Sequence, residues 1–376
     1  MIAVHRRASR VGAAVLSLGL LATGCGSPSS KANGKVEAST TTSTIAKGPE
    51  TTAAQLRSKL AGLLEEHVYL AAAASSARGR ADEAAAASAA LAGNSDALAA
   101  NMTAIFTGAD SDVAKQFATL WKGDLTPNAA SIGTLLNSAV GLPADSVSGP
   151  ITASESAAAS GTNFTGLRAA AAGMVGLGSA LAGGIAKKYP DKIGGDPTSK
   201  AAALLTGLNV ALREHVYLVC AAANAVIGGR ADEFNAAKSA VDANSAAVSD
   251  AIASVFGADA GQKFAPLWAK HIGFFYDYAA GIAAKQQDKA DAAMGNLLAY
   301  SRDFGAFING AIPKISADSA AGLITAHASV LKDVMDAEVA KDWTKAYGNE
   351  RTGADHMSMV AATLATAIVA EMPDKF

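Results

Sequence analysis

The chain has 376 residues, half of them hydrophobic, and its 31 Lys and Arg residues nearly balance its 33 Asp and Glu residues. A net charge of −2 argues against a nucleic-acid-binding protein, which needs a basic surface to neutralise phosphates. Alanine is abundant, β-branched alternation is rare, and apolar residues recur three and four positions apart. The sequence therefore predicts an almost entirely helical protein.

Residues 1–25 have the order of a secretory signal. Basic residues between His5 and Arg10 precede the short apolar segment "VGAAVLSLGLLA", and small residues precede Cys25. The segment "LATGC" resembles the lipobox of bacterial lipoproteins, and this resemblance implies that Cys25 is lipidated and becomes the first residue after cleavage. The alternative is an ordinary signal peptide with a chance cysteine. The predicted location is the extracytoplasmic face of the cell membrane, with the lipid at Cys25 as the anchor.

Residues 26–50 are rich in Ser, Thr, Gly and Lys and have no hydrophobic period. Such a segment cannot bury enough apolar surface to fold, so we expect a disordered tether that holds the folded part off the membrane. The later apolar stretch 169–186 is long enough to span a bilayer, but Ala, Gly and Ser dominate it where Leu, Ile, Val and Phe are expected. The lipid anchor is therefore the predicted attachment to the membrane.

The sequence after residue 50 contains the same pattern twice. "EEHVYLAAAASSARGRADEAAAA" at 65–87 matches "REHVYLVCAAANAVIGGRADEFNAA" at 213–237. Further along, "FATLW" at 117–121 matches "FAPLW" at 264–268. The order and spacing of these matches indicate a tandem duplication.

The two copies also end alike, which sets their boundaries. "LAGGIAKKYPDKI" at 181–193 parallels "LATAIVAEMPDKF" at 364–376, and "GGDPTS" at 194–199 supplies helix breakers and a helix cap between them. The sequence therefore predicts two tandem homologous antiparallel helical-bundle domains, residues 51–195 and 196–376.

The first copy is the shorter one. The first shared motif begins at positions 65 and 213, whereas the shared ending begins at positions 181 and 364, so the separation between the copies grows along the chain. The stretch 122–165 of the first copy is full of Gly, Pro, Ser and Thr and is predicted to be a loop. We therefore expect a degenerate first domain and a complete second domain.

Three histidines divide the second copy into equal units. His215, His271 and His327 follow one another at a constant interval, and turn signals fall midway between them. Each unit is predicted to be a helical hairpin, so the domain would consist of about six helices in three hairpins. Short connections favour antiparallel neighbours and an up-and-down bundle.

Each of these histidines lies on an apolar stripe and is expected to point inward. Asn244, Tyr300 and His356 follow the histidine of their hairpin at a second constant interval, also on apolar stripes. Histidines and partners would all lie about 21 Å from the turns, which predicts one polar layer across the bundle. His67 and Asn94 are the corresponding pair in the first copy.

One interpretation of the polar layer is structural. Buried His, Asn and Tyr side chains can satisfy one another's hydrogen bonds and fix the register of the helices. In the first copy Asp124 and Gly173 stand where His271 and His356 would be expected. A pair that is kept without these partners favours the structural interpretation there.

The other interpretation is a metal or haem site. Four converging imidazoles would suit zinc or copper, and the candidates are His215, His271, His327 and His356. Met359 lies three residues after His356, where a thioether could share its helix face. A thioether together with imidazole suits copper or a haem iron.

Known catalytic motifs are missing from the sequence, including G-x-S-x-G, the P-loop, H-E-x-x-H and the dinucleotide fingerprint. None of the six histidines has Glu three residues before it, so ferritin-like di-iron proteins are similar in architecture alone. "EHVY" and "LWAKHI" resemble helical repeats of secreted bacterial proteins, and this resemblance implies no activity.

The sequence favours a non-enzymatic binding or scaffolding module at the cell envelope. Its expected partners are the membrane, through Cys25, and an envelope protein. The alternative is a metal- or haem-binding protein that uses the histidine layer for copper, zinc or iron. A third interpretation is a redox enzyme built on the same site.

Overall fold

The computed structural model describes residues 46–376, which form twelve α-helices and two short 3₁₀ turns and contain no strand. The predicted all-α fold is confirmed. The signal peptide, Cys25 and residues 26–45 of the tether lie outside the described residues.

The first copy contains three helical hairpins. Its helices are α1 (Thr52–Ser76), α2 (Ala81–Ile105), α3 (Ser111–Trp121, after the 3₁₀ turn Gly108–Asp110), α4 (Leu125–Val140), α5 (Ala144–Ala158) and α6 (Phe164–Lys188). The prediction of a loop at 122–165 is wrong, because α4 and α5 occupy most of it. The Asp124 side chain caps α4 by accepting from the Thr126 N–H at 3.1 Å, and Gly141 ends the helix with a φ of 73°. Many of its small polar residues face solvent, while Ile132 is fully buried.

The second copy contains the three predicted hairpins. Its helices are α7 (Lys200–Ile227), α8 (Ala231–Phe256), α9 (Ala258–Ala283), α10 (Gln287–Ala311), α11 (Ala317–Val339) and α12 (Trp343–Glu371, followed by the 3₁₀ turn Pro373–Lys375). Helices α3, α4 and α5 have 11, 16 and 15 residues, whereas α9, α10 and α11 have 26, 25 and 23. The first copy is therefore shorter because its middle helices are short, and it keeps all three hairpins.

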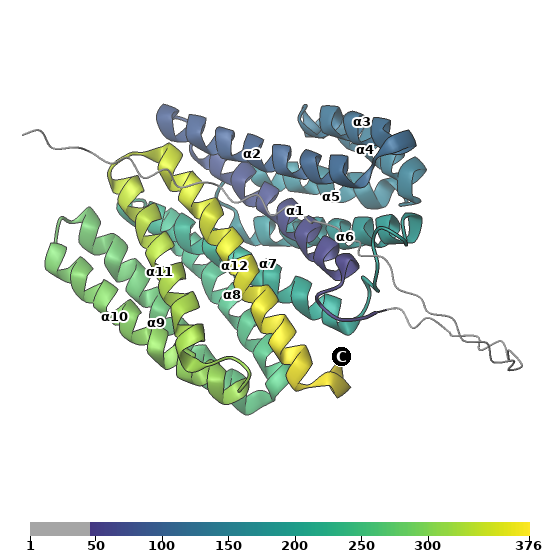
Figure 1. Ribbon diagram of the computed structural model, residues 1–376. Helices are drawn as coiled ribbons and strands as arrows, with labels where there is room; N and C mark the ends of the chain where they lie inside the picture. The colour runs from purple at the N-terminus through teal and green to yellow at the C-terminus, as the bar shows by residue number, and fades with distance from the viewer. Residues whose placement is uncertain (1–45) are drawn as a thin grey trace, which may run out of the picture. The chain divides into compact units, whose positions relative to one another are not determined.

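The two copies pack against each other through α1 and α7, and each of these helices also carries the last helix of its own copy, α6 on α1 and α12 on α7 (Figure 1). Helix α12 reaches α2 of the first copy, and α6 reaches α8 of the second. These equivalent contacts indicate an approximate two-fold relation between the copies. Residues 46–376 belong to one compact unit, within which the boundary between residues 195 and 196 stays a prediction.

Charged and aromatic residues of the repeated motif fill this junction. Tyr69 and Tyr217 stack with ring centroids 5.6 Å apart and an angle of 9° between the rings. Arg351 of the second copy binds Glu66 of the first at 2.5 Å, and Arg168 of the first binds Glu214 of the second at 3.0 Å. The Glu and Tyr positions of "EHVY" therefore join the copies.

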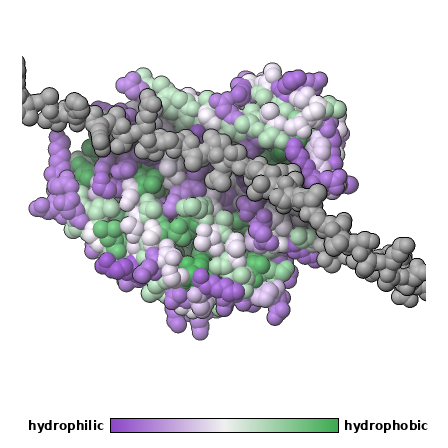
Figure 2. Space-filling view, viewed as in Figure 1, coloured by the Kyte–Doolittle hydropathy of each residue, from purple (hydrophilic) through white to green (hydrophobic). Residues whose placement is uncertain are grey.

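Helices α6, α7 and α12 are long and apolar enough to cross a membrane by length and composition alone. In this structure they lie among other helices, and 67% of the apolar window of α7 is buried. Gly178 of α6 shows how closely they pack, since a Cβ there would come within 2.6 Å of the Ala61 backbone nitrogen on α1. Their composition therefore fits central positions in a bundle. On the face shown in Figure 2, hydrophilic residues are interspersed with scattered apolar ones.

The end of the predicted tether is held by the joint between the copies. The Ala46 carbonyl accepts from the Asp196 N–H at 2.9 Å, and the Lys47 carbonyl accepts from the Ser199 hydroxyl at 2.8 Å. Residues 46–50 are thus attached to the start of the second copy rather than free of it.

Candidate metal centre

Three histidines from three different hairpins meet in the core of the second copy. His215 on α7, His271 on α9 and His327 on α11 are exposed by 0%, 2% and 2%. Each offers a ring nitrogen, and these nitrogens lie within 4.8 Å of one another. The constant interval between the histidines therefore places the three rings at one depth, as the sequence predicted.

The spacing of the ring nitrogens is close to that of metal ligands. His215 Nε2 and His271 Nε2 are 3.3 Å apart. Two nitrogens bound tetrahedrally to one ion at about 2.0–2.1 Å would lie about 3.3 Å apart. The widest separation in the group, at most 4.8 Å, would have to shrink by up to about 1.5 Å, which is within reach of a side-chain rotation. The group is therefore close to a three-nitrogen ligand set.

Most of these ring nitrogens have no hydrogen-bond partner among the described residues. The unpaired atoms are Nδ1 of His215 and His271 and both nitrogens of His327. The contact between His215 and His271 can use one N–H and one lone pair only. Leaving a buried polar group unpaired costs about 1–3 kcal/mol, so the cluster is unfavourable as it stands.

Three of the predicted partners, Asn94, Asn244 and His356, donate to backbone carbonyls and not to the rings. The contacts are Asn94 Nδ2 to the Leu63 carbonyl at 2.9 Å, Asn244 Nδ2 to the Ala211 carbonyl at 3.0 Å, and His356 Nε2 to the Leu323 carbonyl at 3.0 Å. Each carbonyl lies four residues before the histidine of its hairpin. The regular spacing therefore reflects one helix-to-helix hydrogen bond that occurs three times.

His356 and Met359 do not join the group. His356 donates to a carbonyl from the edge of the cluster. Met359 is 51% exposed. The set that the structure brings together therefore has three histidines, where the sequence suggested four with a methionine.

Aromatic rings enclose the three imidazoles. Tyr300 stacks on His271 at 4.9 Å between ring centroids and 18° between planes, with its hydroxyl unpartnered in the described structure. Trp268 lies 4.8 Å from the His215 ring and 4.5 Å from the His271 ring, and Phe275 meets His327 edge-on at 5.9 Å. The role of Trp268 was missed in the sequence, although the repeated "FATLW" and "FAPLW" motifs mark its position.

Burial keeps the three imidazoles neutral. It lowers the pKa of His271 and of His327 to about 3, and that of His215 well below its usual value. At His271 the nearby Trp268 backbone acts in the opposite direction and raises the pKa. The contact between the His271 ring and this backbone lacks the geometry of a hydrogen bond. Neutral imidazole has a free lone pair, which is the form that binds a metal.

The equivalent place in the first copy has a single histidine. His67 Nε2 lies 3.1 Å from Glu155 Oε1, and the His67 ring meets Trp121 at 5.3 Å. On α5 the sequence "ITASES" at 151–156 corresponds to "ITAHAS" at 324–329, so Ser154 replaces His327. Asp124 lines a cleft beside His67 and caps α4. The first copy therefore lacks the ligand set.

No protein-family model, curated protein or solved structure matches this chain. The chemistry of the site is therefore derived from its own donors. Three neutral imidazoles suit zinc, copper or another late first-row ion and leave a fourth position for a further ligand. Calcium and magnesium prefer oxygen ligands, which this group lacks.

Proposed function

We propose that this protein is an exported, lipid-anchored protein of the cell envelope that binds one transition-metal ion through His215, His271 and His327. The convergence of three buried, neutral imidazoles with unpaired nitrogens supports the metal site. The lipobox-like segment that ends at Cys25 supports the location.

A metal site accounts for the geometry better than a hydrogen-bonded structural layer. In a structural layer, the histidines would bond to Asn244, Tyr300 and His356. Asn244 instead donates to a backbone carbonyl and to the Glu214 carboxylate, and His356 donates to a backbone carbonyl. The Tyr300 hydroxyl has no partner within residues 46–376. A bound ion would use one lone pair on each ring and would hold the ring nitrogens close together. Without an ion, the rings alone do not favour this close approach of the nitrogens.

A bare ion fits the three rings better than haem. Haem iron offers two axial positions on opposite sides of a wide macrocycle, whereas the three nitrogens here converge on one point. Zinc and copper both accept three imidazoles at about 2.0–2.1 Å. The proposed cofactor is therefore zinc or copper.

The proposed role is binding rather than catalysis. Trp268, Tyr300 and Phe275 surround the histidines, and all three side chains are buried. A substrate would need a path to the fourth position, and this enclosure leaves little room for one. A scaffolding role at the envelope, with the ion as a structural element or as cargo, is consistent with this enclosure.

The test is the metal content of the purified protein after exposure to zinc or copper and removal of excess ion, combined with X-ray absorption at the metal edge. We expect one ion per chain with three nitrogen neighbours at about 2.0 Å. Chelation should lower the melting temperature, because an ion that binds only the native state stabilises it. A correctly folded protein that holds neither ion would overturn the proposal and leave an enclosed structural cluster.

A further inference from the structure

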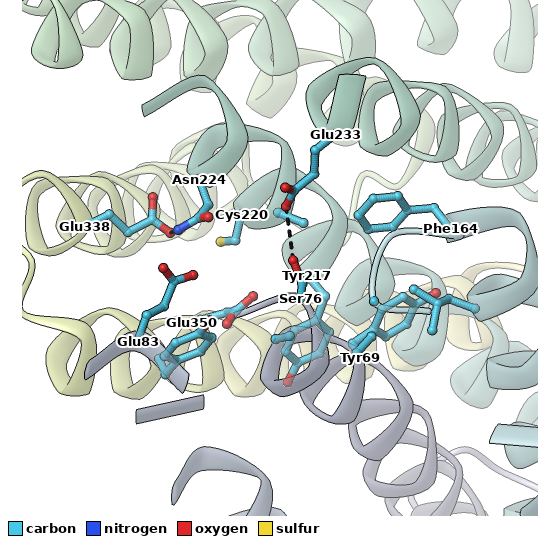
Figure 3. A pocket seen from close by; sticks show the side chains of 16 residues that line it. Tyr69, Ser76, Glu83, Phe164, Tyr217, Cys220, Asn224, Glu233, Glu338 and Glu350 are labelled. Carbon is cyan, nitrogen blue, oxygen red and sulfur yellow. Dashed lines mark hydrogen bonds between the residues drawn. The ribbon is translucent and has the colours of Figure 1, made fainter. Parts of the chain in front are cut away.

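A separate cavity lies where the two copies meet (Figure 3). The open space in it, including its mouth to solvent, is about 550 Å³. Tyrosines and Phe164 line it together with four carboxyl groups. These carboxyl groups belong to Glu83, Glu233, Glu338 and Glu350. The histidine group does not line it.

Two of the carboxyl groups have counterions and two do not. Arg80 binds Glu83 at 2.6 Å, and Arg230 binds Glu233 at 2.7 Å. Glu338 accepts one hydrogen bond from the Asn224 amide at 3.2 Å, and its other oxygen is buried without a partner in the described structure.

Glu350 is the most unusual of the four. It is only 8% exposed, and no hydrogen bond or ion pair reaches it within residues 46–376. Figure 3 shows Glu350, Glu83 and Glu338 at the same end of the cavity. Burial raises the pKa of Glu350 to about 8 and that of Glu338 well above its ordinary value. A buried carboxyl group without a counterion either keeps its proton or is stabilised by a cation that binds beside it.

The approximate two-fold relation gives the cavity two unlike ends. Residues that line it come in equivalent pairs from the two copies, among them Tyr69 with Tyr217, Phe164 with Tyr347, and Leu167 with Glu350. In the last two pairs, the residues are separated along the chain by the same number of positions as the common endings of the two copies. The last pair differs most, because an apolar side chain on α6 stands where α12 has a carboxyl group. One end of the cavity therefore has Glu350, whereas the other has Phe164 and Leu167 together with Glu233, whose charge Arg230 balances (Figure 3).

We propose that this cavity binds a small amphipathic amine. Its ammonium group lies between Glu338 and Glu350, and its alkyl or aryl part extends toward Phe164 and Leu167. The tyrosines beside the acidic end add attraction for a cation over their ring faces.

An organic ammonium fits better than a metal ion. Among the described residues, the three histidines form the group whose ligand atoms lie within 4.8 Å of one another. The carboxyl oxygens of this cavity form no such group, so they are spread more widely than a bare ion requires. An ammonium group carries its own N–H donors and reaches acceptors about 2.8 Å away in different directions. Its carbon chain also accounts for the apolar end, which a metal ion would leave without a role.

The test is calorimetric titration of the full chain with n-hexylamine, with n-hexanol as the uncharged control. We expect hexylamine to bind and hexanol to bind at least tenfold more weakly. Equal binding of the two would mean an apolar pocket without cation recognition and would overturn the proposal. Magnesium or calcium that displaces hexylamine at equal concentration would indicate a cation site of a different kind and would also overturn it.

Two variants at one position separate binding from folding. Glu350→Leu copies the residue at the equivalent position of the first copy, and Glu350→Gln keeps the shape of the side chain. Both should lower hexylamine affinity at least tenfold while the helical circular dichroism and the metal content stay unchanged. Glu371→Gln, which changes an exposed carboxyl group at the end of α12, is the matched control and should bind hexylamine as the unaltered chain does. Hexylamine affinity that survives both changes at Glu350 would refute the proposed site.

Discussion

The two copies of the "EHVY" motif have the same local sequence but different surroundings. His215 meets two further imidazoles, from α9 and α11, whereas His67 meets Glu155 and Trp121. The difference comes from the second and third hairpins, whose helices carry histidines in the second copy and are partly shortened in the first. The motif alone therefore does not make a site, and the residues that complete it lie one and two hairpins further along the chain.

The rest of the motif has the same role in both copies. Glu66 and Glu214 each bind an arginine of the other copy, and Tyr69 stacks on Tyr217. The motif therefore has side chains on two faces of its helix. The histidine points into its own copy, whereas the glutamate and the tyrosine point toward the other copy.

The strongest test of the comparison is to replace one buried histidine by glutamine in each copy. His271→Gln should reduce zinc or copper affinity by at least about 100-fold, because it removes one of the three proposed ligands. His67→Gln should leave metal affinity unchanged, because the first copy has no ligand set around it. Competition with a chelating dye measures both. Equal loss in the two variants would show that the ion binds elsewhere.

The sequence predicted the arrangement of hairpins and histidines because both follow from spacing. Hairpins of equal length that pack side by side bring equivalent positions to equal depth, so His215, His271 and His327 meet. The same spacing located His356 at the right depth but could not identify its partner. A backbone carbonyl and an imidazole are both acceptors at that depth, and the rotation of the helix decides between them.

Composition misled the prediction in two places. Gly, Pro, Ser and Thr in 122–165 suggested a loop, but a capped start at Asp124 and buried residues such as Ile132 at helical spacing make α4 and α5. Glu338 and Glu350 escaped notice because glutamate on a helix is usually exposed. Only the comparison of Glu350 with Leu167, its equivalent in the first copy, marks that position in the sequence.

The two copies should also differ in how their equivalent residues respond to pH. The native state holds a proton on Glu350 up to about pH 8, whereas the unfolded chain releases it near 4.5. The unfolded state therefore binds fewer protons between these values, and stability falls as pH rises through that range, by about 2 kcal/mol or more. Urea unfolding at pH 5 and pH 8 measures this change.

Other titratable groups surround Glu350, so a variant is needed to assign the effect. They are Glu66 on α1, Glu83 on α2, Tyr217 and Cys220 on α7, Glu338 on α11 and Tyr347 on α12. Glu350→Leu should flatten the fall in stability between pH 5 and pH 8 and make the protein more stable at pH 8. An unchanged pH profile in this variant would assign the effect to Glu338 or another neighbour.

The smallest expected effect concerns His67 and Glu155, the pair in the first copy at the place of the three-histidine group in the second. Glu155→Gln should cost about 0.5–1 kcal/mol of stability, because its carboxylate is partly exposed and makes one hydrogen bond to His67 at 3.1 Å. Metal content should not change, because Glu155 belongs to the first copy and does not contact the three-histidine group. Thermal unfolding with and without bound metal measures both quantities. A loss of several kcal/mol, or a loss of metal, would mean that the first copy supports the site in the second, and the two copies could no longer be treated as one binding half and one structural half.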